Sequence, residues 1–203
     1  MANRRLKIIV LFLAVSVVVF AFIPPEEQLG GWIRLIILHG ILSFTGLYTI
    51  YAAGILGAIY LLTNKKSAGL WSRELGYHAV LLWFVGTALS LVSMRVAWGG
   101  MMWNEPYSVA ALTMALLGIG KEYLARSSGG KLRGFAFANL FFAAAMLAIR
   151  QAVVPVMHPV NPIGSSDSAA IRLLPLLFFI ITLATLIELI RLRLQQSGKQ
   201  CGN

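Results

Sequence analysis

Long apolar runs separated by short basic clusters constrain this chain more than any other feature. Six runs are long enough to cross a hydrocarbon core of about 30 Å, which takes about 20 helical residues. They cover approximately residues 7–23, 32–62, 77–96, 107–123, 135–154 and 169–190. The runs leave no room for a soluble domain between them. The sequence therefore predicts an all-α, polytopic membrane protein in which residues 1–203 form a single membrane domain.

Composition agrees with this prediction, because 59% of the residues are hydrophobic and 12% are charged. Ordinary soluble domains have about 25% charged residues. The net charge of +10 would suggest nucleic acid in a soluble protein, but here the basic residues lie between apolar runs. We therefore expect membrane lipid around the chain and no nucleic-acid partner. The single cysteine, Cys201, excludes a disulfide framework and a cysteine metal site.

The basic residues also predict the orientation of the chain. With the N-terminus inside, 13 of the 17 lysines and arginines fall on the cytoplasmic side, as the positive-inside rule requires. Both termini are then cytoplasmic. The first run begins like a cleaved signal peptide, but residues 21–23 make a poor cleavage site and Pro24 and Pro25 follow at once. A retained first helix is favoured.

Small residues at helical spacing recur in the second and fourth spans. Their four-residue spacing places the side chains on one helix face, and the pairs are Ala53 and Gly57, Gly54 and Ala58, and Ala111 and Ala115. Such pairs let neighbouring membrane helices approach closely. Packing explains them without any further function.

The three histidines lie at different predicted depths. His39 lies about two turns below the outer start of the second span, and His158 lies in the outer loop after the fifth. His78 begins the third span from the cytoplasmic side, roughly 20 Å from His39 in depth. Only His39 and His158 can therefore meet, and a pair of imidazoles is a ligand set for haem iron. Each could instead be an ordinary interfacial residue, and His78 is assigned a structural role.

Two further features belong to the outer face. Arg34, Arg95, Arg150 and Arg172 lie at outer span ends, where they could surround an anionic ligand, snorkel to lipid phosphates, or pair with nearby carboxylates. The loop of residues 97–106 reads Ala-Trp-Gly-Gly-Met-Met-Trp-Asn-Glu-Pro and carries aromatic side chains on a turn broken by glycines. It could be a simple aromatic anchor or a shelf for a planar hydrophobic ligand.

This loop resembles the signature of the haem-handling membrane proteins of cytochrome c maturation, most closely the six-span CcmC type. The family's loop reads Trp-Gly-x-x-Trp-x-Trp-Asp between the third and fourth spans. Trp98 and Gly99 match it, and Glu105 replaces the aspartate. Met102 and Asn104 occupy the positions of the second and third tryptophans.

The resemblance extends outside the loop. Trp103 lies one residue from a family tryptophan position, and Arg34 and His39 have the family's five-residue spacing at the start of the second span. His158 lies in the loop before the final span, where the family places its second histidine.

The resemblance implies a carrier or chaperone rather than an enzyme. Such a protein binds haem b as cargo at the outer face of the bacterial cytoplasmic (inner) membrane. It then delivers the haem to a haem chaperone or other cytochrome c maturation subunits. The implied axial ligands of the haem iron are His39 and His158. The other implied haem contacts are Trp98, Trp103, Glu105, Arg34 and Arg172.

Other function classes stay open from the residues alone. One is a small transporter or channel subunit, although the spans show no obvious inverted repeat, and Glu122 and Glu188 are assigned to cytoplasmic ends. Another is a membrane enzyme or quinol-reactive cytochrome subunit, which would need a catalytic cluster beyond the outer histidines. A third is a repurposed paralogue that no longer handles haem.

Overall fold

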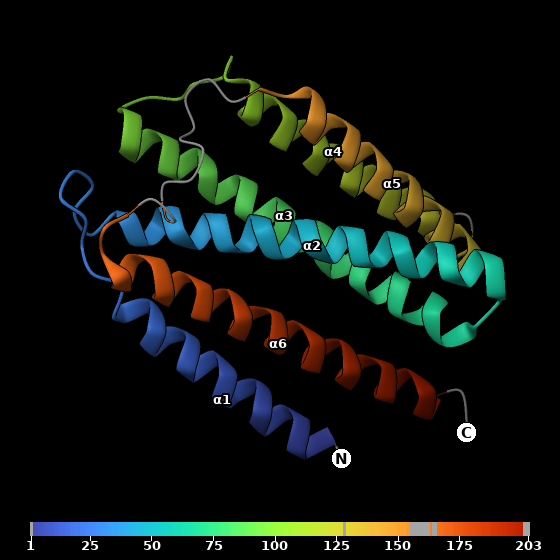
Figure 1. Ribbon diagram of the computed structural model, residues 1–203. Coiled ribbons are helices and arrows are strands. Elements are labelled where there is room, and N and C mark those ends of the chain that lie inside the picture. Colours follow the sequence, from blue (N-terminus) through green and yellow to red (C-terminus); the bar gives the residue numbers. More distant parts are fainter. Residues whose placement is uncertain (1, 128, 155–162, 164–165, 201–203) are drawn as a thin grey trace. The chain divides into compact units, whose positions relative to one another are not determined.

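The computed structural model describes residues 2–127, 129–154, 163 and 166–200, and this part of the chain is helical with no strand. Five of its helices, α2 to α6, are long and apolar enough to cross a membrane, which confirms a polytopic helical membrane protein. The helices (Figure 1) are α1 Ala2–Ala21, α2 Ile33–Thr63, α3 Lys66–Trp98, α4 Pro106–Ser127, α5 Leu132–Ala152 and α6 Ala169–Gln200.

Several helices extend beyond the apolar runs that predicted them. α3 begins at Lys66, eleven residues before the expected start at Tyr77, because Asn64 (φ 55°) and Lys65 alone separate it from α2. A helix continues for as long as its backbone hydrogen bonds are made, whereas hydropathy follows only the part in hydrocarbon. α1 carries three basic residues, Arg4, Arg5 and Lys7, in its first two turns, and it is not among these five helices. Its role as a sixth span stays a prediction.

The chain divides into two compact units, and one of them contains α1 and α6. Arg5 lies 2.5 Å from a carboxylate oxygen of Glu188, and the rings of Phe20 and Phe178 are 5.8 Å apart. The residue near the start of α1 contacts the later of the two α6 residues, and the residue near its end contacts the earlier one, so the two helices are antiparallel. The start of α1 and the end of α6 therefore lie at the same end of this unit (Figure 1), as two termini on one side of a membrane require.

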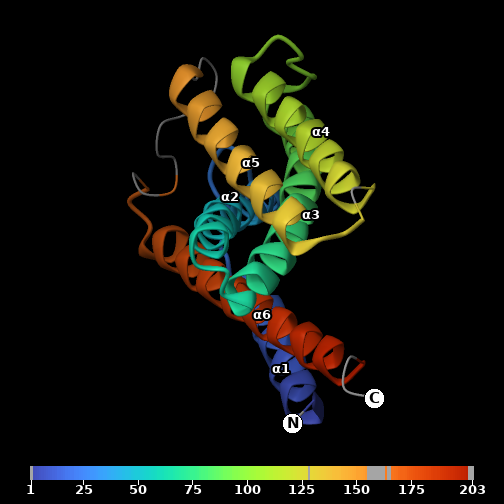
Figure 2. The ribbon, with the colours of Figure 1, turned by 90° about the vertical axis from the view of Figure 1, so that its right-hand side faces the viewer.

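The other unit starts at Leu38 and contains the rest of α2 with α3, α4 and α5 (Figure 2). Neighbouring helices alternate in direction: Ser72 of α3 donates to the Ala53 carbonyl of α2 at 2.8 Å, while Gly86 lies beside Ser43. The hydrophobic core of this unit is formed by Leu47, Ile50, Ala79, Val80, Met114, Phe142, Ala143 and Met146.

Glycines bring α2 very close to α5. A Cβ atom added to Gly57 would lie 2.7 Å from the Ala136 carbonyl oxygen, and one added to Gly54 would lie 2.5 Å from the Ala143 Cβ. Real atoms do not approach so closely, so a larger residue would force the helices apart. The prediction that small residues of the second span permit close packing is confirmed.

Candidate functional site

The antiparallel arrangement places His39 and the tryptophan loop at the same end of the α2–α5 unit. His39 lies one turn beyond Ser43 on α2, and Trp98 lies about three turns beyond Gly86 on α3. Since Ser43 and Gly86 are neighbours, Trp98 lies roughly 12 Å nearer that end than His39 along the helix axes. Both side chains are half-buried.

The loop after α3 folds back on the helix and leaves its large side chains outside. Gly99 ends α3 in the left-handed conformation (φ 72°), and Arg95 donates to its carbonyl oxygen at 3.2 Å. The Met102 backbone N–H donates to the Met94 sulfur at 2.9 Å. Trp103 is 57% exposed and Met101 is 39% exposed. The loop therefore presents an aromatic and an apolar side chain away from the helices.

Glu105 holds the far end of this loop. Its side chain is buried, and Oε2 accepts hydrogen bonds from the Ser108 backbone N–H at 2.8 Å and the Ser108 hydroxyl at 3.2 Å. It thus caps α4, which begins at Pro106, a residue suited to a first helical position. Glu105, proposed from the sequence as a haem contact, has a clear structural role as an N-cap.

The four outer arginines use their side chains in different ways. Arg34 donates from Nε to the Ile23 carbonyl at 2.9 Å, whereas Arg150 and Arg172 are exposed. Within the described ranges none of the four, including Arg95, forms an ion pair. Arg34 and Arg172 belong to the unit with α1 and α6, so they lie outside the unit that holds His39 and the loop. His158 lies outside the described residues, and its pairing with His39 stays a prediction.

His78 lies three turns inside α3 and is 4% exposed. Its Nδ1 lies 2.8 Å from the Glu74 carbonyl oxygen, and its ring meets the Tyr77 ring edge-on at 5.2 Å. These contacts hold the imidazole among its own helix's residues and agree with a structural role.

The depth of His78 also separates it from His39. Its neighbour Ala79 faces Gly46, and Ser72 faces Ala53, so His78 lies at a level between those two α2 residues. That level is about 10 to 20 Å from His39 along α2. The two histidines are therefore at different depths, as the sequence indicates.

A second cluster of functional groups, which the sequence did not single out, lies inside the α2–α5 unit. Lys121 of α4 donates to Glu122 Oε1 at 2.6 Å and to Asn139 Oδ1 of α5. Asn139 Nδ2 donates to the Ser72 carbonyl at 2.8 Å, and the Ser72 hydroxyl donates on to Ala53. One chain of hydrogen bonds thus joins all four helices. We call Ser72, Lys121, Glu122 and Asn139 the buried polar network, and each is at most 9% exposed.

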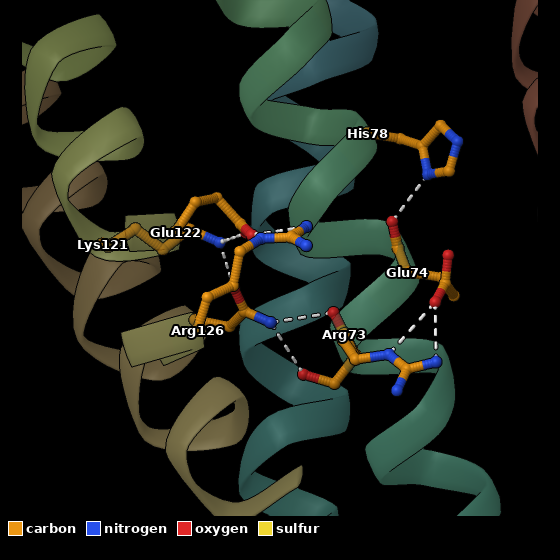
Figure 3. Close-up of polar contacts among 8 residues, drawn as sticks. Arg73, Glu74, His78, Lys121, Glu122 and Arg126 are labelled. Atoms are coloured by element: carbon orange, nitrogen blue, oxygen red, sulfur yellow. Dashed lines mark hydrogen bonds and ion pairs between the residues drawn. The ribbon is translucent and has the colours of Figure 1, made fainter. Parts of the chain in front are cut away.

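Figure 3 shows the side chains of Lys121, Glu122 and Arg126 pointing from α4 toward α3. Arg126 lies 3.5 Å from Glu122 Oε2, and its guanidinium lies 5.3 Å from the Tyr77 ring centroid. Glu122, which the sequence assigns to a cytoplasmic end, lies five residues before the end of α4 at Ser127, so its carboxylate is still within the helix. The available signal was the Lys121–Glu122 pair inside an apolar run, since ionisable groups in spans are costly.

The two ends of the α2–α5 unit offer different chemistry. The end toward which His39 lies also carries the aromatic loop, while the other end has buried charges. In the described part of the chain no three His, Cys, Asp or Glu side chains gather as a metal site. No protein-family model and no curated protein matches this chain.

Proposed function

We propose that the protein binds haem b at the outer membrane face and delivers it to a partner during cytochrome c biogenesis. The observation that supports this most is the placement of His39 at the same end of the α2–α5 unit as the exposed loop around Trp103. An imidazole and an aromatic shelf at one end of a helical unit are the groups that a hydrophobic, iron-bearing macrocycle needs.

Each residue has a distinct role in this proposal. His39 and His158 bind the haem iron through neutral imidazole nitrogens. Trp98 and Trp103 cover the porphyrin face, and Glu105 fixes the shape of their loop by capping α4. The family resemblance assigns Arg34 and Arg172 to the propionates, since arginine binds carboxylates in a bidentate manner. No covalent bond of the haem is made or broken, so the protein acts as a carrier.

The proposed setting is the bacterial cytoplasmic membrane. With both termini inside, the His39 end faces outward, where c-type cytochromes are assembled. The expected partner is a haem chaperone or another cytochrome c maturation subunit that receives the cargo at this face.

The test measures haem bound to the purified protein in detergent. The wild type should show the absorption spectrum of a haem with two histidine ligands. His39→Ala and His158→Ala should each lose that spectrum and most of the haem. The control His78→Gln should keep both, because His78 lies about 10 to 20 Å from His39 in depth.

A second arm tests the loop. Trp103→Ala should weaken haem binding by about fivefold to tenfold, the effect of losing roughly 1 kcal/mol of aromatic contact. Trp32→Ala is a matched control, since Trp32 is 58% exposed and Trp103 57%. Unchanged haem content in both outer-histidine variants would reject the ligand assignment.

The buried polar network favours one alternative. Ionisable groups inside membrane helices often mark a transport path, so a small transporter is the second candidate. Solute flux through haem-free protein in proteoliposomes, abolished by Lys121→Met, would support a transporter and replace the haem proposal.

A further inference from the structure

A shallow groove of about 230 Å³ runs between α3 and α4, beside the buried polar network. Its walls are almost entirely apolar, and Leu81, Phe84 and Ile119 are each about half exposed. In a membrane helix such side chains face lipid. The residues that line the groove are Tyr77, Val80, Leu81, Phe84, Ile119 and Glu122.

One end of the groove is positively charged. Arg126 lies over Tyr77, and its side chain is 58% exposed. Its contact with Glu122 is long, at 3.5 Å, while Lys121 approaches the other oxygen of that carboxylate at 2.6 Å. Two cations thus share one anion. Because guanidinium has five N–H donors, Arg126 keeps donors for a further acceptor.

Its neighbours hold Arg126 in place. Lys121 is fixed by Asn139, and Glu122 lies between Lys121 and Arg126, so the carboxylate links the exposed guanidinium to the buried polar network. Arg73 is already paired with Glu74 at 2.9 Å and adds no net charge. Among these residues, the positive charge that is left over is therefore that of Arg126.

We propose that this groove binds an anionic phospholipid of the cytoplasmic leaflet. The phosphate lies against Arg126, and an acyl chain follows the apolar walls toward Phe84. A soluble anion would contact Arg126 but not the apolar walls, whereas a phospholipid contacts Arg126 through its phosphate and the apolar walls through an acyl chain. With the predicted orientation this end of the unit faces the cytoplasm, where basic pockets between helices meet anionic head groups.

The headgroup is tested with the full-length protein in detergent, by native mass spectrometry with added phosphatidylglycerol or phosphatidylcholine. The wild type should prefer phosphatidylglycerol. Arg126→Gln should weaken its binding by about fivefold or more. Arg133→Gln removes the same charge from an exposed residue near the start of α5, outside the groove, and should change binding less than about twofold. Equal losses in both variants would show general attraction to basic surface and overturn the site.

The acyl chain is tested by filling the groove. Ile119→Trp should reduce phosphatidylglycerol binding, while Leu116→Trp, at a 70% exposed position outside the groove, should leave it unchanged. Binding that survives Ile119→Trp, or that excess inorganic phosphate abolishes, would contradict a lipid. Haem content in Arg126→Gln should stay at the wild-type level, so this proposal and the haem proposal can fail separately.

Discussion

Both polar atoms of the Asn139 side-chain amide form hydrogen bonds. Its oxygen accepts from Lys121, its nitrogen donates to Ser72, and it is 2% exposed. Asn139→Leu keeps the size but leaves a buried ammonium with one partner fewer. We expect the free energy of unfolding to fall by about 2 to 4 kcal/mol, measured by thermal or denaturant unfolding in detergent.

The expected loss of stability comes from the Lys121 ammonium, which loses its Asn139 acceptor, and a double variant isolates this effect. Asn139→Leu combined with Lys121→Met removes the ammonium as well, so most of the lost stability should return. Ser90→Ala is the control, because the Ser90 hydroxyl only donates to a carbonyl of its own helix, at Thr87. A double variant as unstable as Asn139→Leu alone would argue against a charge effect.

Among the elements, α2 needs small residues where it packs against α5. Gly57→Ala would place a methyl group 2.7 Å from the Ala136 carbonyl oxygen, so α2 and α5 must separate. Overpacking of this kind costs about 1 to 3 kcal/mol. We expect a lower melting temperature for Gly57→Ala in detergent than for the wild type.

The control for this substitution is another helical glycine with space around it. A Cβ atom on Gly120 of α4 meets nothing within 4 Å, so Gly120→Ala should be neutral or slightly stabilising. Equal melting temperatures for Gly57→Ala and Gly120→Ala would mean that close approach of α2 and α5 is not needed.

Sequence patterns predicted the helices better than the contacts between them. The long apolar runs located α2 and α4 to within a few residues, because hydropathy reports the part of a helix that meets lipid. They placed the start of α3 eleven residues late, since Arg73 and Glu74 look like loop residues but pair with each other within the helix. The bond between Asn139 and Ser72 was beyond prediction, because it joins residues 67 positions apart.

The candidate outer site was predicted unevenly. His39 lies near the start of α2 and Trp98 lies at the end of α3. Two successive spans cross the membrane in opposite directions, so residue order alone suffices to place both residues at one end. The start of α4 could also be anticipated from Pro106, because proline is favoured at the first position of a helix, whereas glutamate is not a preferred N-cap residue. The fold-back of Met102 onto Met94 could not, because it depends on the tertiary path of the loop.

For the whole molecule, the orientation of both ends can be tested with the chain's own cysteine. Cys201 is the single cysteine, and the predicted topology places it in the cytoplasm. A membrane-impermeant maleimide should therefore label it only after the cells are permeabilised.

The companion variant reports the opposite face. Asn104→Cys in a Cys201→Ser background places a thiol at an exposed position of the loop between α3 and α4, and it should react in intact cells. Labelling of Cys201 in intact cells would show that the orientation is the opposite of the predicted one. It would also move the His39 end to the cytoplasm, which the haem proposal does not permit.

The bond between Lys121 and Asn139 bears on how the chain enters the bilayer. The two residues lie on opposite arms of the α4–α5 hairpin, whose short turn contains Gly129 and Gly130 at positive φ. During synthesis α4 emerges first, and a lysine within a helix opposes insertion by up to about 3 kcal/mol. Asn139 offsets part of this cost once α5 follows. We therefore expect the two helices to integrate as one hairpin, and we expect a nascent chain that ends after α4 to hold that helix poorly in the membrane.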